Sequence, residues 1–224
     1  MSKVGLGLEL GQRDVRRRHG GQIQVPVAAT IAGLFVIVAL SAGMVFNTIS
    51  VALPKIVEER VSDVSFLMIG GLTTAVFLCG GIAQIAVGRL VEHIKPHILF
   101  AILAVLQFSG VVWSAYATGA TLLVALAFTM AAIYGQITVN DLVIARYTAD
   151  AWRGRVYAVR YFLTFMISGV AVSLLAVLYG RGGFGLVLGT TALVAAGFLV
   201  AAILIAALAN GVERAQLPQP LPAE

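Results

Sequence analysis

Six long stretches of almost uninterrupted apolar residues, separated by short polar segments, make up most of this chain. They run approximately over residues 27–53, 65–87, 98–117, 122–145, 161–179 and 184–209. A helix that crosses a membrane needs about 20 predominantly apolar residues, because the hydrocarbon layer is about 30 Å thick and the helix rises about 1.5 Å per residue. The pattern therefore predicts six transmembrane helices, which we number first to sixth in chain order.

Proline and glycine mark the ends of several of these runs. Pro54 follows the first run, Gly88 and Arg89 follow the second, Gly119 follows the third, and the segment 180–183 separates the fifth from the sixth. Such residues stop helices or turn the chain. We therefore expect a helix end and a short loop at each of these positions.

The composition supports a membrane protein. The chain is 60% hydrophobic and 11% charged, with a mean hydropathy of +0.98, whereas soluble domains carry about 25% charged residues. We expect an all-α, polytopic fold with a basic N-terminal segment at 1–26, a transmembrane domain at 27–209 and a proline-rich tail at 210–224. The first run is too long for the apolar core of a cleaved signal peptide, which spans about 7–15 residues.

Lysine and arginine are distributed unevenly between the loops. Twelve of the 15 lie in the N-terminal segment, the second-to-third loop, residues 146–160 and the C-terminal tail, which share one side of the membrane when six helices cross it. The other three, Lys55, Arg60 and Arg181, lie in the loops on the opposite side. Basic residues near helix ends are retained in the cytoplasm. We therefore expect both termini to be cytoplasmic, in a bacterial inner membrane. The net charge of +5 then reflects topology, and we expect no nucleic-acid partner. The basic N-terminal segment is either a flexible tail that sets the topology or a contact for anionic membrane lipid.

Catalytic chemistry finds no support in the sequence. No nucleophile, base and orienting group can be assembled from the polar residues, so we expect neither enzyme activity nor a cofactor. The single Cys79 excludes an intrachain disulfide. His93 and His97 are four residues apart, but Pro96 lies between them and breaks the helix that would align two imidazoles on a metal. We therefore expect no metal site.

Polar side chains inside the runs are costly in a membrane, so they mark faces that meet protein or water. On the fourth helix Tyr134, Thr138 and Asp141 fall on one face, and Gln136 and Asn140 fall on nearly the opposite one. This arrangement predicts a central fourth helix, with one face toward a cavity and the other toward a neighbouring helix. The candidate substrate pathway consists of Asn47, Thr73, Tyr134, Thr138 and Asp141.

Asp141 is the only carboxylate inside an apolar run. It lies near the cytoplasmic end of the fourth helix, and Arg160 lies at a similar depth at the start of the fifth. Because the two residues are symmetric about the middle of the loop, an antiparallel hairpin brings them level, and we expect an ion pair. Its role is open between a structural pair or cytoplasmic gate and a carboxylate that binds protons or substrate.

Two loop sequences carry a resemblance to a known family. They are "GRLVEHIKPH" at 88–97 and "NDLVIARYTADAWRGRVYAVRYFLTF" at 140–165. Together with six helices and cytoplasmic ends, they resemble the C-terminal half of a major facilitator superfamily transporter. The family's second-to-third loop runs Gly-x-Leu-Ala-Asp-Arg-x-Gly-Arg-Arg. Gly88 and Leu90 match it and Glu92 replaces its Asp, while His93 and Lys95 depart from it.

The resemblance covers about residues 27–209 and implies that the first, second, fourth and fifth helices line a pathway. It also implies that Glu92, Arg153 and Arg155 join the gate with Asp141 and Arg160. Intact members of the family have twelve helices. The expected function is a half-size secondary active transporter that moves an unidentified small molecule after pairing with a second six-helix half, either an identical copy or a separate chain, with proton coupling as one option. The alternative is a non-transporting remnant or scaffold of the same fold.

Overall fold

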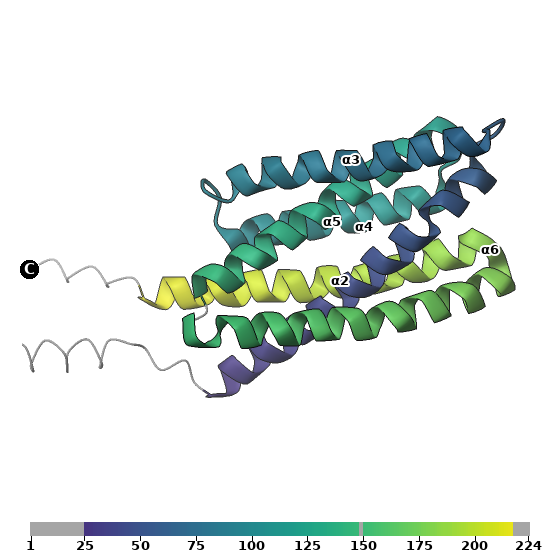
Figure 1. Ribbon diagram of the computed structural model, residues 1–224. Coiled ribbons are helices and arrows are strands. Elements are labelled where there is room, and N and C mark those ends of the chain that lie inside the picture. The colour runs from purple at the N-terminus through teal and green to yellow at the C-terminus, as the bar shows by residue number, and fades with distance from the viewer. Residues whose placement is uncertain (1–24, 148–149, 217–224) are drawn as a thin grey trace, which may run out of the picture. The chain divides into compact units, whose positions relative to one another are not determined.

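The computed structural model describes residues 25–147 and 150–216 (Figure 1). Most of the predicted N-terminal segment 1–26 and the last eight residues of the predicted tail lie outside the described residues. The chain forms two compact units, Met1–Leu34 and Phe35–Glu224. Of the first unit, the described residues are helical. All contacts given below lie within the second unit.

The described part of the chain consists of five helices and contains no strand. They are α2 (Val25–Arg60), α3 (Phe66–Leu90), α4 (Pro96–Tyr116), α5 (Gly119–Tyr147) and α6 (Asp150–Gln216). Each carries a stretch long and apolar enough to cross a membrane, with mean hydropathies between 1.9 and 2.7. Because hydrocarbon offers the backbone no hydrogen-bond partner, apolar segments of this length satisfy their own backbone groups as helices. The fold is therefore all-helical and has the composition of an integral membrane bundle.

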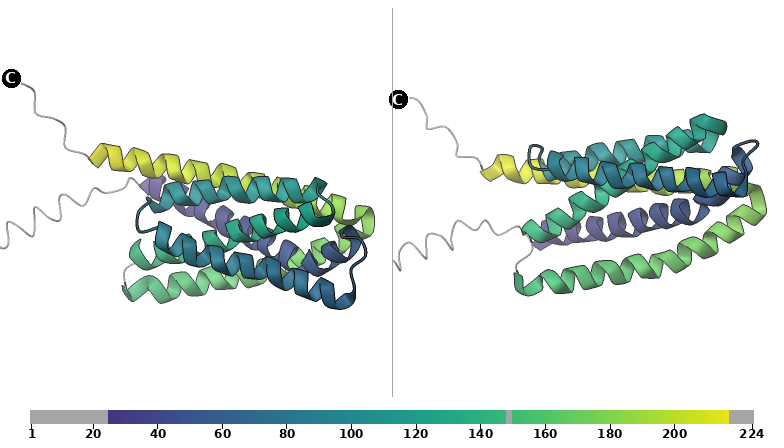
Figure 2. Two further views of the ribbon diagram at one scale, coloured as in Figure 1. Left: turned by 90° about the horizontal axis from the view of Figure 1, so that it is seen from above. Right: turned by 45° about the horizontal axis from the view of Figure 1, so that its top comes forward.

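The number of helices is five in the described residues, where the sequence predicts six. The fifth and sixth apolar runs both lie in α6, which is 67 residues long and is interrupted by non-helical backbone only at Gly182 (φ −158°, ψ 20°) and Gly183 (φ 60°, ψ −159°). Figures 1 and 2 show α6 reversing its direction, so that its green and yellow parts run opposite ways. We call residues 150–181 the first arm and residues 184–216 the second arm. Glycine at positive φ turns the chain in very few residues, so no separate loop divides the two arms.

The predicted end of the first helix is wrong, while that of the second is confirmed to within one helical turn. α2 continues through Pro54 to Arg60, and α3 continues past Gly88 to Leu90. Proline has no N–H, so Pro54 removes only the helical hydrogen bond to the carbonyl of Ser50. Among apolar surroundings, ending the helix would leave more backbone groups unsatisfied than this single lost bond does, and membrane helices tolerate proline for that reason.

Capping and turn residues account for the short connections from α2 to α3, from α3 to α4 and from α4 to α5. Ser65 caps α3, since its hydroxyl oxygen accepts a hydrogen bond of 3.3 Å from the backbone N–H of Met68. Pro96 occupies the first turn of α4, where a missing N–H costs nothing. Gly119 begins α5 with a φ of +59°, a conformation that glycine adopts without strain. Capping and turn residues therefore keep these connections short.

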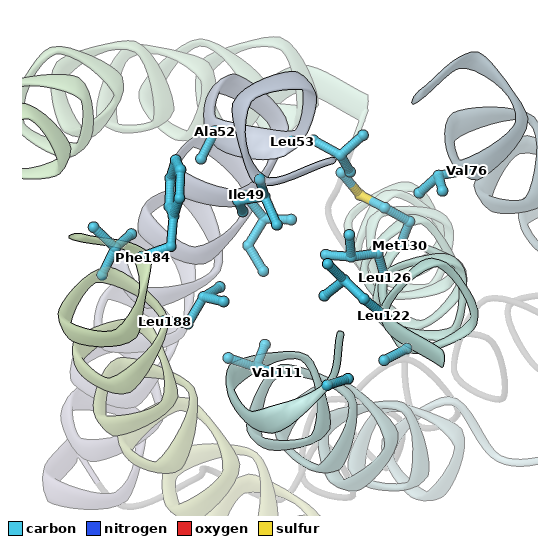
Figure 3. Close-up of a cluster of buried hydrophobic side chains, with 14 of the residues drawn as sticks. Ile49, Ala52, Leu53, Val76, Val111, Leu122, Leu126, Met130, Phe184 and Leu188 are labelled. Carbon is cyan, nitrogen blue, oxygen red and sulfur yellow. The ribbon is translucent and has the colours of Figure 1, made fainter. Parts of the chain in front are cut away.

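The core lies where α2, α4, α5 and the second arm of α6 meet, as Figure 3 shows. Ile49 and Leu53 of α2, Val111 of α4, Leu126 of α5 and Leu188 of α6 are all fully buried there. Interdigitated aliphatic side chains of this kind give close packing, which is what holds helices together where lipid removes the hydrophobic drive between them.

Two polar contacts add to this packing across helices. Arg60, the last residue of α2, donates to the backbone carbonyls of Ser114 and Ala115 in the last turn of α4, at 3.3 and 3.0 Å. Gln136 of α5 donates to the carbonyl of Leu103 in α4 at 3.0 Å. A cation at a helix C-terminus is favoured by the helix dipole and satisfies carbonyls that have no partner inside the helix.

α5 holds the central position that its two polar faces predict. It is the most buried of the candidate spans and packs against α3, α4 and α6. α3 is the least buried of them and exposes large apolar side chains such as Leu78, Ile82 and Ile85. An exposed apolar face is normal for a helix whose surroundings are lipid or a partner helix.

Candidate functional site

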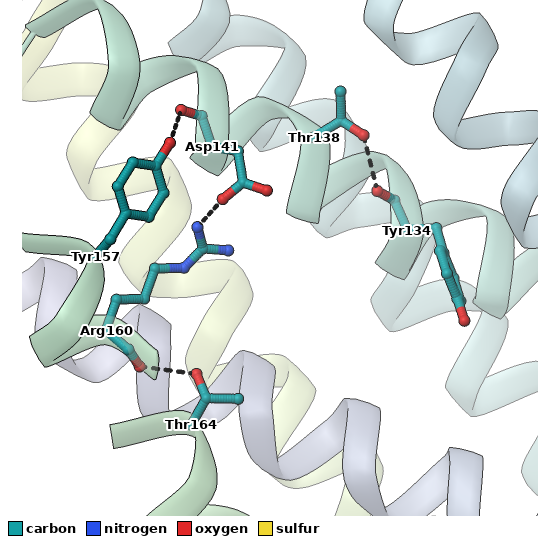
Figure 4. Close-up of polar contacts among 6 residues, drawn as sticks. All are labelled: Tyr134, Thr138, Asp141, Tyr157, Arg160 and Thr164. Carbon is teal, nitrogen blue, oxygen red and sulfur yellow. Dashed lines mark hydrogen bonds and ion pairs between the residues drawn. The ribbon is translucent and has the colours of Figure 1, made fainter. Parts of the chain in front are cut away.

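The charged pair Asp141 and Arg160 joins the last turns of α5 to the first arm of α6. The Arg160 guanidinium donates to Oδ1 of Asp141 (Figure 4). The side chain of Arg160 is 13% exposed and that of Asp141 is 38% exposed. A charge held this far from water needs a counter-charge, so each side chain lowers the burial cost of the other. The two residues that the hairpin argument brings level are thus in contact.

Aromatic residues of α6 position the arginine. Tyr157 donates its hydroxyl to the backbone carbonyl of Asp141 at 2.9 Å, and Thr164 donates to the carbonyl of Arg160 at 3.0 Å. The ring of Tyr161 lies 5.9 Å from the Arg160 guanidinium and stacks on Tyr157 with centroids 6.2 Å apart. Residues three or four apart share one face of a helix, so these four side chains form a polar face on the first arm.

A space of about 210 Å³, which we call the inner cavity, lies between α2, α5 and the first arm of α6. Phe46, Ile133 and Ile137 give it a largely apolar wall. Asn140 and Arg160 bring polar groups to it, and among the described lining residues Arg160 is the one that carries a charge. The lining of the inner cavity is therefore largely apolar and includes one cationic side chain.

A second, more open space of about 520 Å³, which we call the outer cleft, lies between α3, α5 and the start of α6. Thr138 and Asp141 of α5 line it, together with Gln84 and Gly88 of α3 and with Tyr157. Thr138 and Asp141 are two of the five residues predicted for the substrate pathway. The structure therefore brings these two together at one surface.

The ion pair connects the two spaces. Arg160 lines the inner cavity and Asp141 lines the outer cleft, and their side chains meet between them. This division follows the two polar faces of α5, because Asn140 lies on the inner face and Thr138 on the outer one. Gln136 shares the inner face and reaches the neighbouring helix α4, as the two-faced pattern requires. α5 thus separates two cavities that a single salt bridge links.

The other three predicted pathway residues line neither space. Asn47 donates to the carbonyl of Gly43 in its own helix and accepts a hydrogen bond from Ser168 of α6, both at 2.8 Å. Tyr134 is half-buried and packs its ring against α3. Thr73 is buried on α3, and its hydroxyl has no hydrogen-bond partner among the described residues. In this structure, Asn47 and Tyr134 make packing contacts between helices.

The predicted gate residues outside the pair lie at the surface. Glu92 is exposed in the turn after α3. Arg153 forms a salt bridge of 2.8 Å with Asp150, and Arg155 lies over the Trp152 ring, 4.7 Å from its centroid. Both arginine contacts are local to the first turns of α6. They stabilise the start of that helix, and a gating role for the three residues remains a prediction.

Sequence reasoning missed Tyr157 and Tyr161 as parts of the site. The signal was present, because Tyr157, Arg160, Tyr161 and Thr164 follow the spacing of one helix face within an apolar stretch. Aromatic residues on membrane helices are common at lipid interfaces, so the spacing alone did not distinguish a site from an anchor.

Neither His93 nor His97 lies at this site. Nδ1 of His93 lies 3.3 Å from the carbonyl of Arg89, and Nε2 of His97 lies 2.9 Å from Oδ1 of Asn210 in the second arm of α6. Cys79 is exposed on α3. Within residues 25–147 and 150–216, no three or more His, Cys, Asp or Glu residues gather in a way that could hold a metal ion.

The fold and the site together define a helical protein of membrane-spanning composition, with a charged pair between two cavities. Comparison with protein-family models, with curated proteins and with solved structures gave no match. The functional argument therefore rests on the chain's own residues.

Proposed function

We propose that this chain is a half-size, major-facilitator-like secondary transporter, which moves a small molecule after pairing with a second half. The observation that carries the proposal is the arrangement around α5, where the two members of one salt bridge line different spaces, Arg160 the inner cavity and Asp141 the outer cleft. Opening of Asp141 and Arg160 would join the two spaces. A packed scaffold has no need of a charged pair at such a junction, since burying charge costs free energy.

The same proposal requires an even number of membrane crossings. We count the two antiparallel arms of α6 as two crossings, which gives six in all. The turn after α3, the end of α5 and the start of α6 then share one side, because Gly88, Ala145 and Tyr157 line the same cleft. His97 and Asn210 bring the start of α4 and the end of α6 to one another. The basic loops collect there, and the proposal places this side in the cytoplasm of a bacterial cell.

Pairing follows from the proposed pathway. The halves of this transporter class are related by an axis along the membrane normal, so both halves need the same orientation. A six-crossing chain with both ends on one side meets a copy of itself, or a separate half, without inversion. The alternative, a scaffold that moves nothing, keeps the fold and the packing but leaves the inner cavity closed to at least one side.

Thiol accessibility tests the proposal without knowledge of the substrate. We would place a single cysteine at Thr164, which lines the inner cavity, in a Cys79→Ala background. A charged, membrane-impermeant methanethiosulfonate is then applied to right-side-out and to inverted vesicles. A transporter that alternates exposes Thr164→Cys to both sides in turn, so modification is expected in both preparations.

The matched control is Leu193→Cys, which is 73% exposed on the second arm and faces away from the cavity in the proposed arrangement. It should react in neither preparation. Modification of Thr164→Cys from one side only, or from neither, would favour the scaffold alternative. Co-purification of two differently tagged copies separates an identical partner from a different one.

A further inference from the structure

The inner cavity has the size and chemistry of a small-ligand site. A cavity of roughly 150 Å³ lined by aliphatic and aromatic side chains takes up benzene, and the inner cavity is somewhat larger at about 210 Å³. Phe46 from α2 and Ile133 and Ile137 from α5 provide an apolar surface for a ring or a branched aliphatic group. The space therefore suits a body of about the size of one six-membered ring with one substituent.

One end of this cavity is cationic. Arg160 is the one charged side chain among its described lining residues, and Asn140 adds a further hydrogen-bonding group to the lining. The counter-ion of Arg160 is absent from that wall, because Asp141 lines the outer cleft. From inside the cavity, the nearest charged group is thus the guanidinium of Arg160.

The guanidinium has donors to spare. It contacts Asp141 through one nitrogen and one oxygen, whereas a guanidinium has five N–H donors in a fork that matches a carboxylate with two parallel bonds. Among the described residues, the guanidinium also lies over the face of the Tyr161 ring. Asp141, being 38% exposed, can be solvated from the outer cleft once it is released. Exchange of Asp141 for another carboxylate leaves neither charge buried alone.

We infer that the inner cavity binds a small monocarboxylate with an apolar body, whose carboxylate takes the Arg160 guanidinium from Asp141. The apolar body packs on Phe46 and the isoleucines, and Asn140 donates its amide N–H to the bound carboxylate. The ligand carboxylate first engages the other donors of Arg160 and then displaces Asp141, because two carboxylates held at one cation repel each other. As a substrate assignment this rests on the proposed transport function, whereas binding itself does not require transport.

Equilibrium binding to the purified full chain in nanodiscs tests the inference. The probes are benzoate and 3-methylbutanoate, each compared with its neutral amide, in calorimetric titrations at pH 7. We expect each acid that fits the cavity to bind at least tenfold more tightly than its amide. The inference is overturned when neither acid binds more tightly than its amide.

Variants of the pair then assign the preference to Arg160. Asp141→Asn removes the competing carboxylate and should tighten the binding of the acid several-fold, while weaker binding would refute the exchange. Removal of the arginine alone leaves Asp141 without its counter-charge and destabilises the chain. The double variant Asp141→Asn with Arg160→Gln avoids this, because it carries no charge at either position. The acid should lose its advantage over the amide there, and an unchanged advantage would refute the role of Arg160.

Two controls separate the site from the proposed transport. Ala42→Leu puts a larger side chain into the cavity wall and should weaken acid and amide alike. Ser173→Ala lies on the first arm, outside the lining of the inner cavity, and should leave the binding of both unchanged. Acid-selective binding in nanodiscs together with one-sided thiol modification would reject the transport proposal and keep the binding site. Two-sided modification without acid-selective binding would support the transport proposal and reject the carboxylate site.

Discussion

Substitution of Gly110 by alanine should destabilise the contact between α4 and α5. A Cβ at this position would lie 2.5 Å from Oγ1 of Thr129, 3.1 Å from Cα of Thr129 and 3.1 Å from Cδ1 of Phe128. The hydroxyl of Thr129 is itself fixed, because it donates to the carbonyl of Ala125 at 2.7 Å in a buried position. The alanine methyl therefore meets both a held side chain and the backbone, and the two helices must move apart.

Two opposing effects set the magnitude. Replacing glycine by alanine inside a helix gains up to about 1 kcal/mol in helix propensity. Forcing an extra methyl group into a packed contact costs about 1–3 kcal/mol. Because the methyl group meets backbone as well as a held side chain, the cost should lie at the upper end of this range, about 2–3 kcal/mol. The expected net loss is then about 1–2 kcal/mol, which lowers the unfolding midpoint of a chain of this size by about 2–8 °C. The assay is thermal unfolding in detergent, followed by circular dichroism.

Gly71→Ala is the matched control, since Gly71 also lies inside a helix but a Cβ there has no neighbour within 4 Å. Its midpoint should stay the same or rise. Thr129→Ala removes the nearest clashing atom, so Gly110→Ala should cost less in that background than in the wild-type chain. Part of the cost should persist, because the backbone of Thr129 remains in place. Equal midpoints for Gly110→Ala and Gly71→Ala would contradict the packing described for α4 and α5.

Three further predictions concern polar contacts and topology. Asp141→Asn or Arg160→Gln alone should each lower the free energy of unfolding by about 1–3 kcal/mol, which is less than for a fully buried pair because Asp141 is partly exposed. The double variant should lose less than the sum of the two single losses. Additive losses in detergent unfolding would show that the two side chains do not interact. Arg60→Met keeps the apolar stem but removes the donors to the last carbonyls of α4, so a loss of about 1–2 kcal/mol is expected in the same assay, and an unchanged midpoint would argue against the contact. In a cysteine-free background, an impermeant thiol reagent applied to intact cells should label Ser62→Cys, and it should label Ala151→Cys only after permeabilisation; the opposite pattern would invert the proposed orientation.

The positions of the helices could be predicted from the sequence because the apolar runs are long and their lengths match a bilayer. Their ends were harder to predict. A proline often ends a helix in water, where the freed carbonyl is solvated. α2 nevertheless continues past Pro54 to Arg60, because apolar surroundings penalise further exposed backbone. The count of helices failed at Gly182 and Gly183, because composition alone cannot show how few residues a glycine-rich turn needs.

The candidate site was predictable where chain connectivity fixed it. Asp141 and Arg160 are close in sequence across one reversal, so their meeting follows from the hairpin. Asn47 shows the limit, because a polar residue on an apolar helix can satisfy itself on its own backbone, as Asn47 does at the carbonyl of Gly43. The inner cavity was not predictable, since it depends on how three helices that are distant in sequence pack together.

The reversal within α6 bears on how the chain enters the membrane during synthesis. The two arms are joined through Gly182 and Gly183 without a separate loop, so during synthesis the second apolar segment follows the first almost at once. We therefore expect the two arms to insert together as a helical hairpin. Gly183 has a φ of 60° and a ψ of −159°, a region essentially limited to glycine. A side chain at this residue would strain the joint on which that paired insertion depends, so the earliest consequence of such a substitution falls on biogenesis, before the folded bundle exists.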